Sequence, residues 1–250
     1  MHTRFILIET SHAGNVGATA RAMKVMGFSD LVLVRPRWSN VLRREETIQR
    51  ASGALDVLDQ ARIVDALDDA LEGMTHLCAT AMTPRDFGPP TVEPRPHFAE
   101  LAEHTGVAFL FGSERYGMRN EDVYRCHACI RIPTNPQFGS LNLASAVQVL
   151  AYEWRLALGG FANPEQNNAT TTSTPTPTST SERADAQQIA GLLSHWQEAL
   201  TAIDFLDPDS PKKLMPRLNQ LLNRANLTQE EVHILRGIAK ATLQASAVKR

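Results

Sequence analysis

The sequence of this 250-residue chain predicts an α/β domain built on a mostly parallel sheet. Two observations support that fold class. Short apolar runs alternate with helical patterns, and the runs are continuous, as in strands that are covered on both faces. Alternation of strands and helices favours parallel pairing through right-handed crossovers. The expected strands are residues 5–8, 31–34, 76–79, 107–111 and 129–132.

Helical patterns separate these runs and follow the last one, at residues 16–26, 64–71, 97–103, 120–124 and 142–158. Gly27, Gly73 and Gly106 stand just past three of these helices, where a C-cap favours a positive φ. The last helix has an apolar surface wider than one core-facing stripe. Two interpretations of that surface stay open: a helix buried deeply in its own domain, or one that also packs on a second subunit.

A change in composition divides the chain. Residues 170–181 read TTTSTPTPTSTS and contain nothing apolar, so they cannot bury enough surface to offset the entropy of ordering. We therefore expect a first domain at residues 1–162, a disordered Ser/Thr/Pro linker at 163–183 and a small helical extension at 184–250. The extension has helical patterns at residues 185–205, 212–224 and 230–245.

Composition excludes several classes of protein. Three cysteines do not make a disulfide framework, and no apolar run reaches the ~18–20 residues of a membrane helix, so a cytoplasmic protein is expected. A formal net charge of −2 would argue against a nucleic-acid partner, but arginines gather locally, which makes the overall charge too coarse a criterion. The clustered arginines are Arg35, Arg37, Arg43, Arg44, Arg50, Arg115, Arg119 and Arg125.

Familiar nucleotide and metal motifs are missing from the loops at the strand ends. Gly14 and Gly17 form G-x-x-G rather than the dinucleotide G-x-G-x-x-G. Gly112 and Gly117 have P-loop spacing without the Lys-Ser/Thr pair, which excludes an NTPase but still indicates close backbone approach. The C-x-x-C at residues 126–129 has no second pair, so we expect buried packing cysteines and no metal.

Three motifs in order resemble the SpoU branch of the SPOUT superfamily, whose members are RNA ribose 2′-O-methyltransferases. They are NVGATAR at residues 15–21, LFGSERYG at 110–117, and IRIP at 130–133 followed by SLNLA at 140–144. The segments IETSHAGNVG at 8–17, NPQFGSLNLA at 135–144 and ILRG at 234–237 are similar more narrowly to a bacterial enzyme of this branch. That enzyme methylates the ribose at position 32 of the tRNA anticodon loop.

The resemblance implies a SPOUT-type sheet with a C-terminal trefoil knot, a homodimer, a tRNA substrate, and S-adenosylmethionine as the cofactor. The helical extension would bind tRNA. DNA would not be a substrate because it lacks the 2′-hydroxyl that is methylated. The reaction would need no metal. Arg21, supplied across the dimer interface, would steer a substrate phosphate, and Asn15, Glu114, Ser140 and Asn142 would orient Arg21 and the ribose. The implied cofactor residues are Thr80, Ala81, Met82, Gly112, Ile132, Gly139, Ser140 and Leu141.

Three alternatives stay open at this point. The same chemistry could act on another RNA such as rRNA. The chain could be a catalytically silent RNA-binding module on the same scaffold, although Asn15, Arg21, Glu114 and Asn142 are all present. It could also be an α/β enzyme that does not act on RNA.

Overall fold

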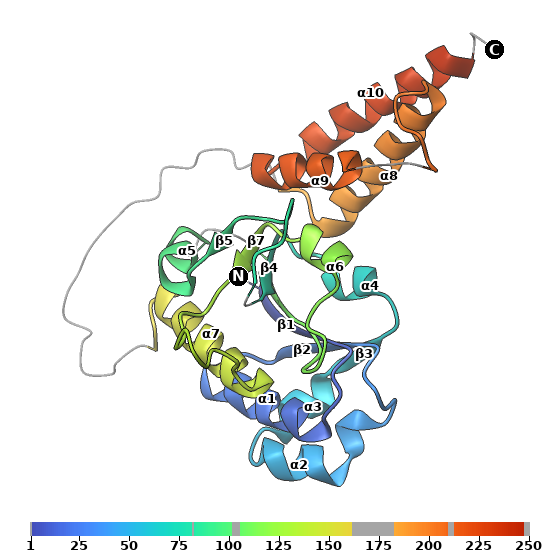
Figure 1. Ribbon diagram of the computed structural model, residues 1–250. Coiled ribbons are helices and arrows are strands. Elements are labelled where there is room, and N and C mark those ends of the chain that lie inside the picture. The colour runs from blue at the N-terminus through green and yellow to red at the C-terminus, as the bar shows by residue number, and fades with distance from the viewer. Residues whose placement is uncertain (1, 82, 102–105, 162–182, 210–212, 248–250) are drawn as a thin grey trace.

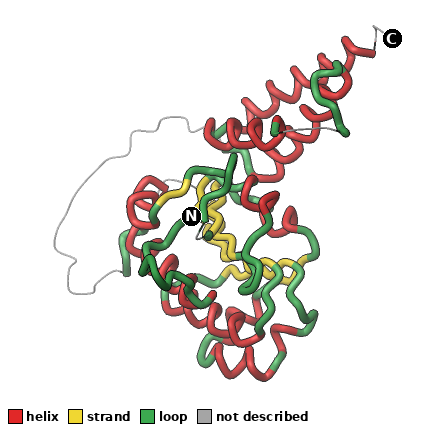
Figure 2. Tube along the Cα trace, viewed as in Figure 1, coloured by secondary structure: helices red, strands yellow, loops and turns green. Residues whose placement is uncertain are grey.

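The computed structural model describes residues 2–81, 83–101, 106–161, 183–209 and 213–247. At its centre lies a seven-stranded sheet with the strand order β3-β2-β1-β6-β4-β7-β5, in which all neighbouring strands are parallel (Figures 1 and 2). The strands are β1 (His2–Ile8), β2 (Asp30–Val34), β3 (Arg62–Val64), β4 (His76–Thr80), β5 (Thr91–Val92), β6 (Gly106–Phe111) and β7 (Ala128–Ile130). The expected mostly parallel α/β architecture is confirmed.

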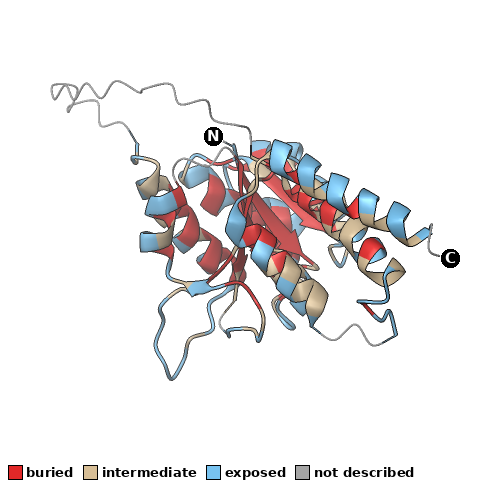
Figure 3. Cartoon of the chain, turned by 90° about the horizontal axis from the view of Figure 1, so that it is seen from above, coloured by how far each residue is buried: buried red, intermediate tan, exposed pale blue. Residues whose placement is uncertain are grey.

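Helices cover both faces of this sheet because the strands are apolar on both sides. One face packs on α1 (Ala13–Val25), α3 (Leu55–Gln60), α5 (Pro94–Leu101) and α7 (Leu143–Ala157), with α2 (Glu45–Ala51) and a short 3₁₀ turn, η1 (Val41–Arg43), against α1. The other face packs on α4 (Leu67–Leu71) and α6 (Asn120–Tyr124). Figure 3 shows the buried strands between these layers.

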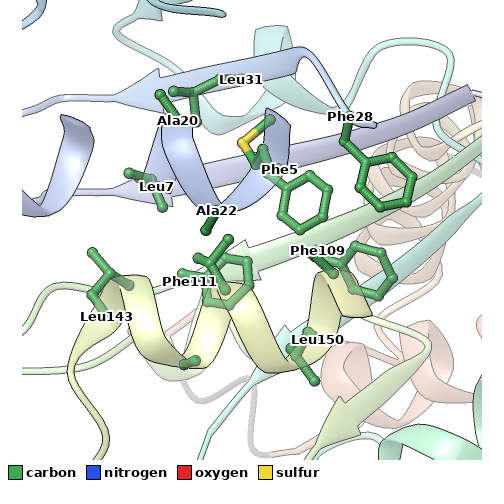
Figure 4. Close-up of a cluster of buried hydrophobic side chains, with 14 of the residues drawn as sticks. Phe5, Leu7, Ala20, Ala22, Phe28, Leu31, Phe109, Phe111, Leu143 and Leu150 are labelled. Atoms are coloured by element: carbon green, nitrogen blue, oxygen red, sulfur yellow. The ribbon is translucent and has the colours of Figure 1, made fainter. Parts of the chain in front are cut away.

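The larger core fills the space between the sheet and α1 and α7 (Figure 4). Phe5 of β1 and Phe109 of β6 lie with ring centroids 5.4 Å apart, and Trp154 of α7 packs edge-on against Phe109. Trp154 is fully buried, and its indole N–H donates to Thr3 Oγ1 at 2.9 Å. The wide apolar surface of α7 is therefore partly explained by burial within its own domain.

The C-terminal helices form a separate layer of their own. They are α8 (Ala186–Ala202), α9 (Leu214–Ala225) and α10 (Gln229–Ala247), and Figure 1 shows them gathered beside α4 and α6. Their shared core is small, and amide side chains of α9 attach them to the sheet domain. Asn219 Nδ2 donates to the Tyr124 carbonyl at 2.6 Å, and Asn223 Nδ2 to the Arg125 carbonyl at 3.1 Å.

Several local expectations need correction. β3 and β5 were not expected, because strands of three and two residues leave no readable pattern. Residues 64–66, expected to be helical, end β3 and precede α4, and α2 and α3 occupy a stretch expected to have no helix. Gly27 and Gly73 have positive φ as expected (72° and 73°), but Gly106 begins β6 instead of capping a helix.

Other expectations stay predictions. The linker expected at residues 163–183 lies outside the described residues except for Arg183. The trefoil knot and the homodimer also stay predictions. Within the part of the chain that the structure describes, no helix is long and apolar enough to cross a membrane.

Candidate active site

A cavity of about 580 Å³ opens at the carboxyl ends of β4, β6 and β7, where loops of an open parallel sheet meet. Its volume falls within the ~300–1,000 Å³ range of small-molecule sites. Its lining combines backbone from glycine-containing loops with apolar side chains. The lining residues that matter below are His12, Asn15, Thr80, Ala81, Thr83, Arg85, Gly112, Glu114, Ile132, Gly139, Ser140, Leu141 and Asn142.

Glu114, in the loop after β6, joins that loop to the loop after β1. Its Oε1 accepts from Asn15 Nδ2 at 2.8 Å and from Thr10 Oγ1 at 3.0 Å. Its Oε2 accepts from both the backbone N–H and the hydroxyl of Ser11, each at 2.8 Å. β1 and β6 are neighbouring parallel strands, so their carboxyl ends bring these two loops together.

These donors also fix the charge of Glu114. Partial burial alone would raise the pKa of its carboxyl, but the hydrogen bonds from Asn15 and Ser11 outweigh burial and lower the pKa to about 2. The carboxylate is therefore ionised at neutral pH, and its oxygens are already occupied by donors. Glu114 is suited to hold the site in shape and unsuited to accept a proton from substrate.

Asn142 extends this network to α7. Its Nδ2 donates to Asn15 Oδ1 at 2.9 Å, while its Oδ1 accepts from the Ala144 N–H and caps the helix. Asn15 therefore uses both ends of its amide, with Glu114 on one side and Asn142 on the other. The three residues, which come from three separate motifs, form one hydrogen-bonded chain at the cavity wall.

The glycines of the second motif allow its loop to fold back on itself. The backbone N–H of Ser113 donates to the Gly117 carbonyl at 3.0 Å, and that of Gly117 to the Ser113 carbonyl at 2.8 Å. A Cβ on Gly112 would lie 2.2 Å from the carbonyl carbon of Gly117. Gly117 itself has φ of +68°. The sequence predicts that some group lies close to the backbone at these glycines, and in the structure that group is the backbone of the same loop.

Gly17 serves helix packing. A Cβ at this position would lie 2.0 Å from the Thr47 carbonyl oxygen, so α1 and α2 approach each other closely at this point. Gly14 similarly faces the Glu46 side chain. The G-x-x-G spacing read from the sequence therefore belongs to the contact between two helices.

The structure brings together most of the predicted site residues. Asn15, Glu114, Ser140 and Asn142 line the cavity, and so do the described residues predicted to hold the cofactor: Thr80, Ala81, Gly112, Ile132, Gly139, Ser140 and Leu141. Met82 lies outside the described residues. The roles assigned to all of these residues stay predictions.

Arg21 lies apart from this group. It is exposed on α1 and is not among the described residues that line the cavity of its own chain. Asn15 and Arg21 are six residues apart, so at ~100° per residue their side chains leave α1 about 120° apart around the helix axis. Arg21 therefore lies outside the cavity lining among the described residues of its own chain.

Sequence reasoning missed Thr10 and Ser11, which hold Glu114, and Thr83 and Arg85, which line the cavity. Thr10 and Ser11 stood within a recognised motif, in a polar loop directly after a buried strand. That position at the carboxyl end of β1 was the available signal.

Comparison with known families and proteins agrees with this arrangement. Residues 2–152 match the SpoU rRNA Methylase family, and residues 187–250 match the C-terminal domain of the tRNA methyltransferase TrmJ. The first match covers the whole sheet and α7 up to Tyr152, including every element that lines the cavity.

Similar proteins span almost the whole chain. The tRNA (cytidine/uridine/adenosine-2′-O-)-methyltransferase TrmJ of Pseudomonas aeruginosa is 41% identical, over 96% of this chain and 93% of its own length. The tRNA (cytidine/uridine-2′-O-)-methyltransferase TrmJ of Photorhabdus laumondii is 40% identical, over 94% of each. Among solved structures, TrmJ from Z. mobilis superposes with a TM-score of 0.80 at 28% identity, covering 96% of this chain and 99% of that one.

Proposed function

This chain belongs to the SpoU methylase family and is an RNA methyltransferase, and we propose that it methylates the ribose 2′-hydroxyl at position 32 of the tRNA anticodon loop. The observation that carries the proposed methyl transfer is the hydrogen-bonded chain of Asn142, Asn15 and Glu114 at the wall of the cavity. The choice of position 32 rests on the resemblance of residues 8–17, 135–144 and 234–237. The names of the two curated relatives support a tRNA substrate. The match of residues 187–250 to a tRNA methyltransferase domain favours tRNA over rRNA.

The cavity fits S-adenosylmethionine in size and chemistry. Ile132, Leu141 and Leu143 offer apolar surface for an adenine ring, and backbone at Gly112 and Gly139 offers hydrogen-bonding groups for its edge. Bound there, the cofactor supplies a methyl group already activated on a sulfonium. No Lewis acid is needed to activate such a group, so we propose that methyl transfer proceeds without a metal.

The protein must then position the 2′-hydroxyl and lower the cost of removing its proton. Glu114 is not the base, because its pKa is about 2 and its oxygens accept hydrogen bonds from the loop after β1. Its function in the proposed reaction is to hold Asn15, which in turn fixes Asn142 and the start of α7. Ser140, three residues before α7 begins, lines the same cavity and would contact the ribose.

We further propose a homodimer in which Arg21 of the partner subunit approaches the cavity. Arg21 is turned away from the cavity of its own chain and is free of burial. Tyr152 and Leu156 on α7 are each 47% exposed and offer apolar surface to a second subunit. A guanidinium is permanently charged, so Arg21 would steer a substrate phosphate and stabilise the developing alkoxide without acting as a base.

The test uses methyl-labelled S-adenosylmethionine and unmodified tRNA transcripts, followed by mapping of the methylated ribose. We expect label at position 32 and none on a transcript with 2′-deoxyribose at that position. Because the names of the two relatives differ in the bases they include, the transcripts should carry C, U and A at position 32 in turn. Methylation at another position, or of rRNA in preference to tRNA, would contradict the proposal.

A further inference from the structure

Three potential metal ligands meet on the sheet face opposite α4 and α6, and none of them is among the residues that line the cavity. His76 and Cys78 lie two residues apart on β4, so their side chains leave the same face of the strand. His97 reaches them from α5. The Nε2 atoms of His76 and His97 are 3.3 Å apart, and the nearest ligand atoms of all three residues lie within 4.8 Å of one another.

The two elements that carry these residues are held firmly. β4 lies between β6 and β7 in the sheet, so both of its edges are paired. α5 is anchored by the fully buried Phe98, whose ring packs edge-on against Phe109 and Trp154. His97 is adjacent to this anchor in sequence. The spacing of the three ligands is therefore set by the core and not by flexible loops.

The separation of the two imidazole nitrogens suits a tetrahedral zinc ion. With Zn–N bonds of ~2.0–2.1 Å, two nitrogen ligands of tetrahedral Zn²⁺ stand about 3.3–3.4 Å apart, which matches the separation of His76 Nε2 and His97 Nε2. A thiolate is a soft ligand and two imidazoles are borderline ligands, a set that favours zinc over magnesium or calcium. Three protein ligands leave the fourth position to a water molecule.

A groove on the protein surface reaches one of the three ligands. A groove of about 240 Å³ beside α5 is lined by His97 together with two carboxylates, Glu93 and Glu100. Glu93 and Glu100 are exposed, while His76 and Cys78 are buried, so His97 stands between the groove and the buried pair. Negative charge at the mouth of the groove would raise the local concentration of cations.

We propose that His76, Cys78 and His97 bind one Zn²⁺ ion, with the Cys78 thiol giving up its proton to solvent as the metal binds. The site is separate from the proposed chemistry of methyl transfer. It uses the one cysteine that stands outside the C-x-x-C of residues 126–129. By joining β4 to α5, the ion would stabilise the strand that ends at Thr80, a residue of the cavity wall.

The first experiment measures metal in the full-length wild-type protein. The protein is treated with a chelator, incubated with zinc, dialysed and analysed by elemental analysis. We expect about one zinc per chain and a higher thermal midpoint than in the metal-free protein. Replacement with Co²⁺ should give a sulfur-to-cobalt charge-transfer band and the visible bands of four-coordinate cobalt. The proposal would be overturned if the wild-type protein retained no zinc and gave no such cobalt spectrum. The contact between His76 and His97 would then be only a hydrogen bond between two imidazoles.

Variants identify the ligands. We expect His97→Gln and Cys78→Ala to lose zinc, and Cys78→Ala to lose the charge-transfer band as well. The matched controls are Cys129→Ser, another buried cysteine, and His233→Gln, an exposed histidine on α10, and both should keep the metal. Retention of zinc by His97→Gln would contradict the ligand set. His97 is partly exposed on α5, so the His97→Gln variant is expected to fold. If Cys78→Ala does not fold, the cobalt spectrum of the wild-type protein shows whether a thiolate binds the metal.

Discussion

The sheet domain and the C-terminal helices each place a tryptophan at an internal contact, and the two residues differ in burial. Trp154 of α7 is fully buried, and its N–H donates to Thr3 at 2.9 Å. Trp196 of α8 is only partly buried, and its N–H donates to the Leu235 carbonyl at 3.2 Å. The same residue type thus belongs to a large contiguous core in one region and to the edge of a small one in the other.

The difference indicates how each region is stabilised. The sheet domain buries whole strands between two helical layers, so apolar burial alone can hold it together. The C-terminal helices bury few large side chains among themselves and rely in addition on Asn219 and Asn223, whose amides bind carbonyls of the sheet domain. We therefore expect perturbations of the sheet domain to affect folding and chemistry, and perturbations of α9 to affect docking and RNA binding.

The largest expected effect on stability is that of Trp154→Ala, which removes a fully buried indole and leaves Thr3 without its donor. We expect a loss of about 3–5 kcal/mol in the free energy of unfolding, measured by urea denaturation. The matched variant Trp196→Ala should cost roughly 1–2 kcal/mol because less surface is buried there. Equal losses in the two variants would remove the distinction between the regions.

Arg21→Ala tests the chemistry of the sheet domain. We expect kcat/KM for methyl transfer to fall by roughly 10²–10³-fold, because the charge proposed to stabilise the developing alkoxide is lost. Binding of S-adenosylmethionine, measured by calorimetry, should stay nearly unchanged. Lys24→Ala, three residues further along α1 and paired with Asp56, is the control and should retain activity. Normal turnover by Arg21→Ala would remove this residue from the mechanism.

Mixing two inactive variants tests the shared site directly. If Arg21 serves the cavity of the partner subunit, a mixture of Arg21→Ala and Asn142→Ala subunits should regain part of the activity. One intact cavity then forms in each mixed dimer, with its Asn142 from one chain and its Arg21 from the other. Activity that stays absent after subunit exchange has been verified would place both residues in the same chain's site.

The double variant Asn219→Ala/Asn223→Ala tests docking of the C-terminal helices. Each amide hydrogen bond contributes ~0.5–1.5 kcal/mol, so we expect about 1–3 kcal/mol less docking energy and roughly tenfold weaker tRNA binding. Hydrogen exchange should become faster in α9 and stay unchanged in β1 and β6. Gln187→Ala, which removes an exposed amide on α8, is the control. Unaltered exchange in α9 would show that other contacts hold this layer.

The titration of Glu114 gives an effect that is confined to acidic pH. Its pKa falls from 4.5 to about 2 on folding, so its ionised form stabilises the fold above pH 4.5. That contribution is lost as the pH falls through the folded-state pKa of about 2. Urea unfolding across this window should show a shallower decline in stability for Glu114→Gln than for the wild type. Identical pH dependence of the two proteins would show that the carboxylate is not held as described.

The central strands could be predicted from the sequence because each is a continuous apolar run covered on both faces. β3 could not, since it is a three-residue edge strand with no buried residue, and α2 buries only Thr47 and Ala51 behind a charged surface. Asn15, Glu114 and Asn142 could be picked from separate motifs. The hydrogen bonds among these three residues could not be predicted, because the bonds depend on the strand register that pairs Leu7 of β1 with Phe111 of β6.

The position of β6 has a consequence for biosynthesis. β6 lies between β1 and β4, and it is made after both, so a ribosome releases the two neighbours before the strand that separates them exists. The unpaired backbone edge of β1 then stays open while about a hundred residues are added, which takes several seconds at ~5–20 residues per second. We expect insertion of β6 to limit the rate of folding and the nascent chain to need protection from aggregation until that step is complete.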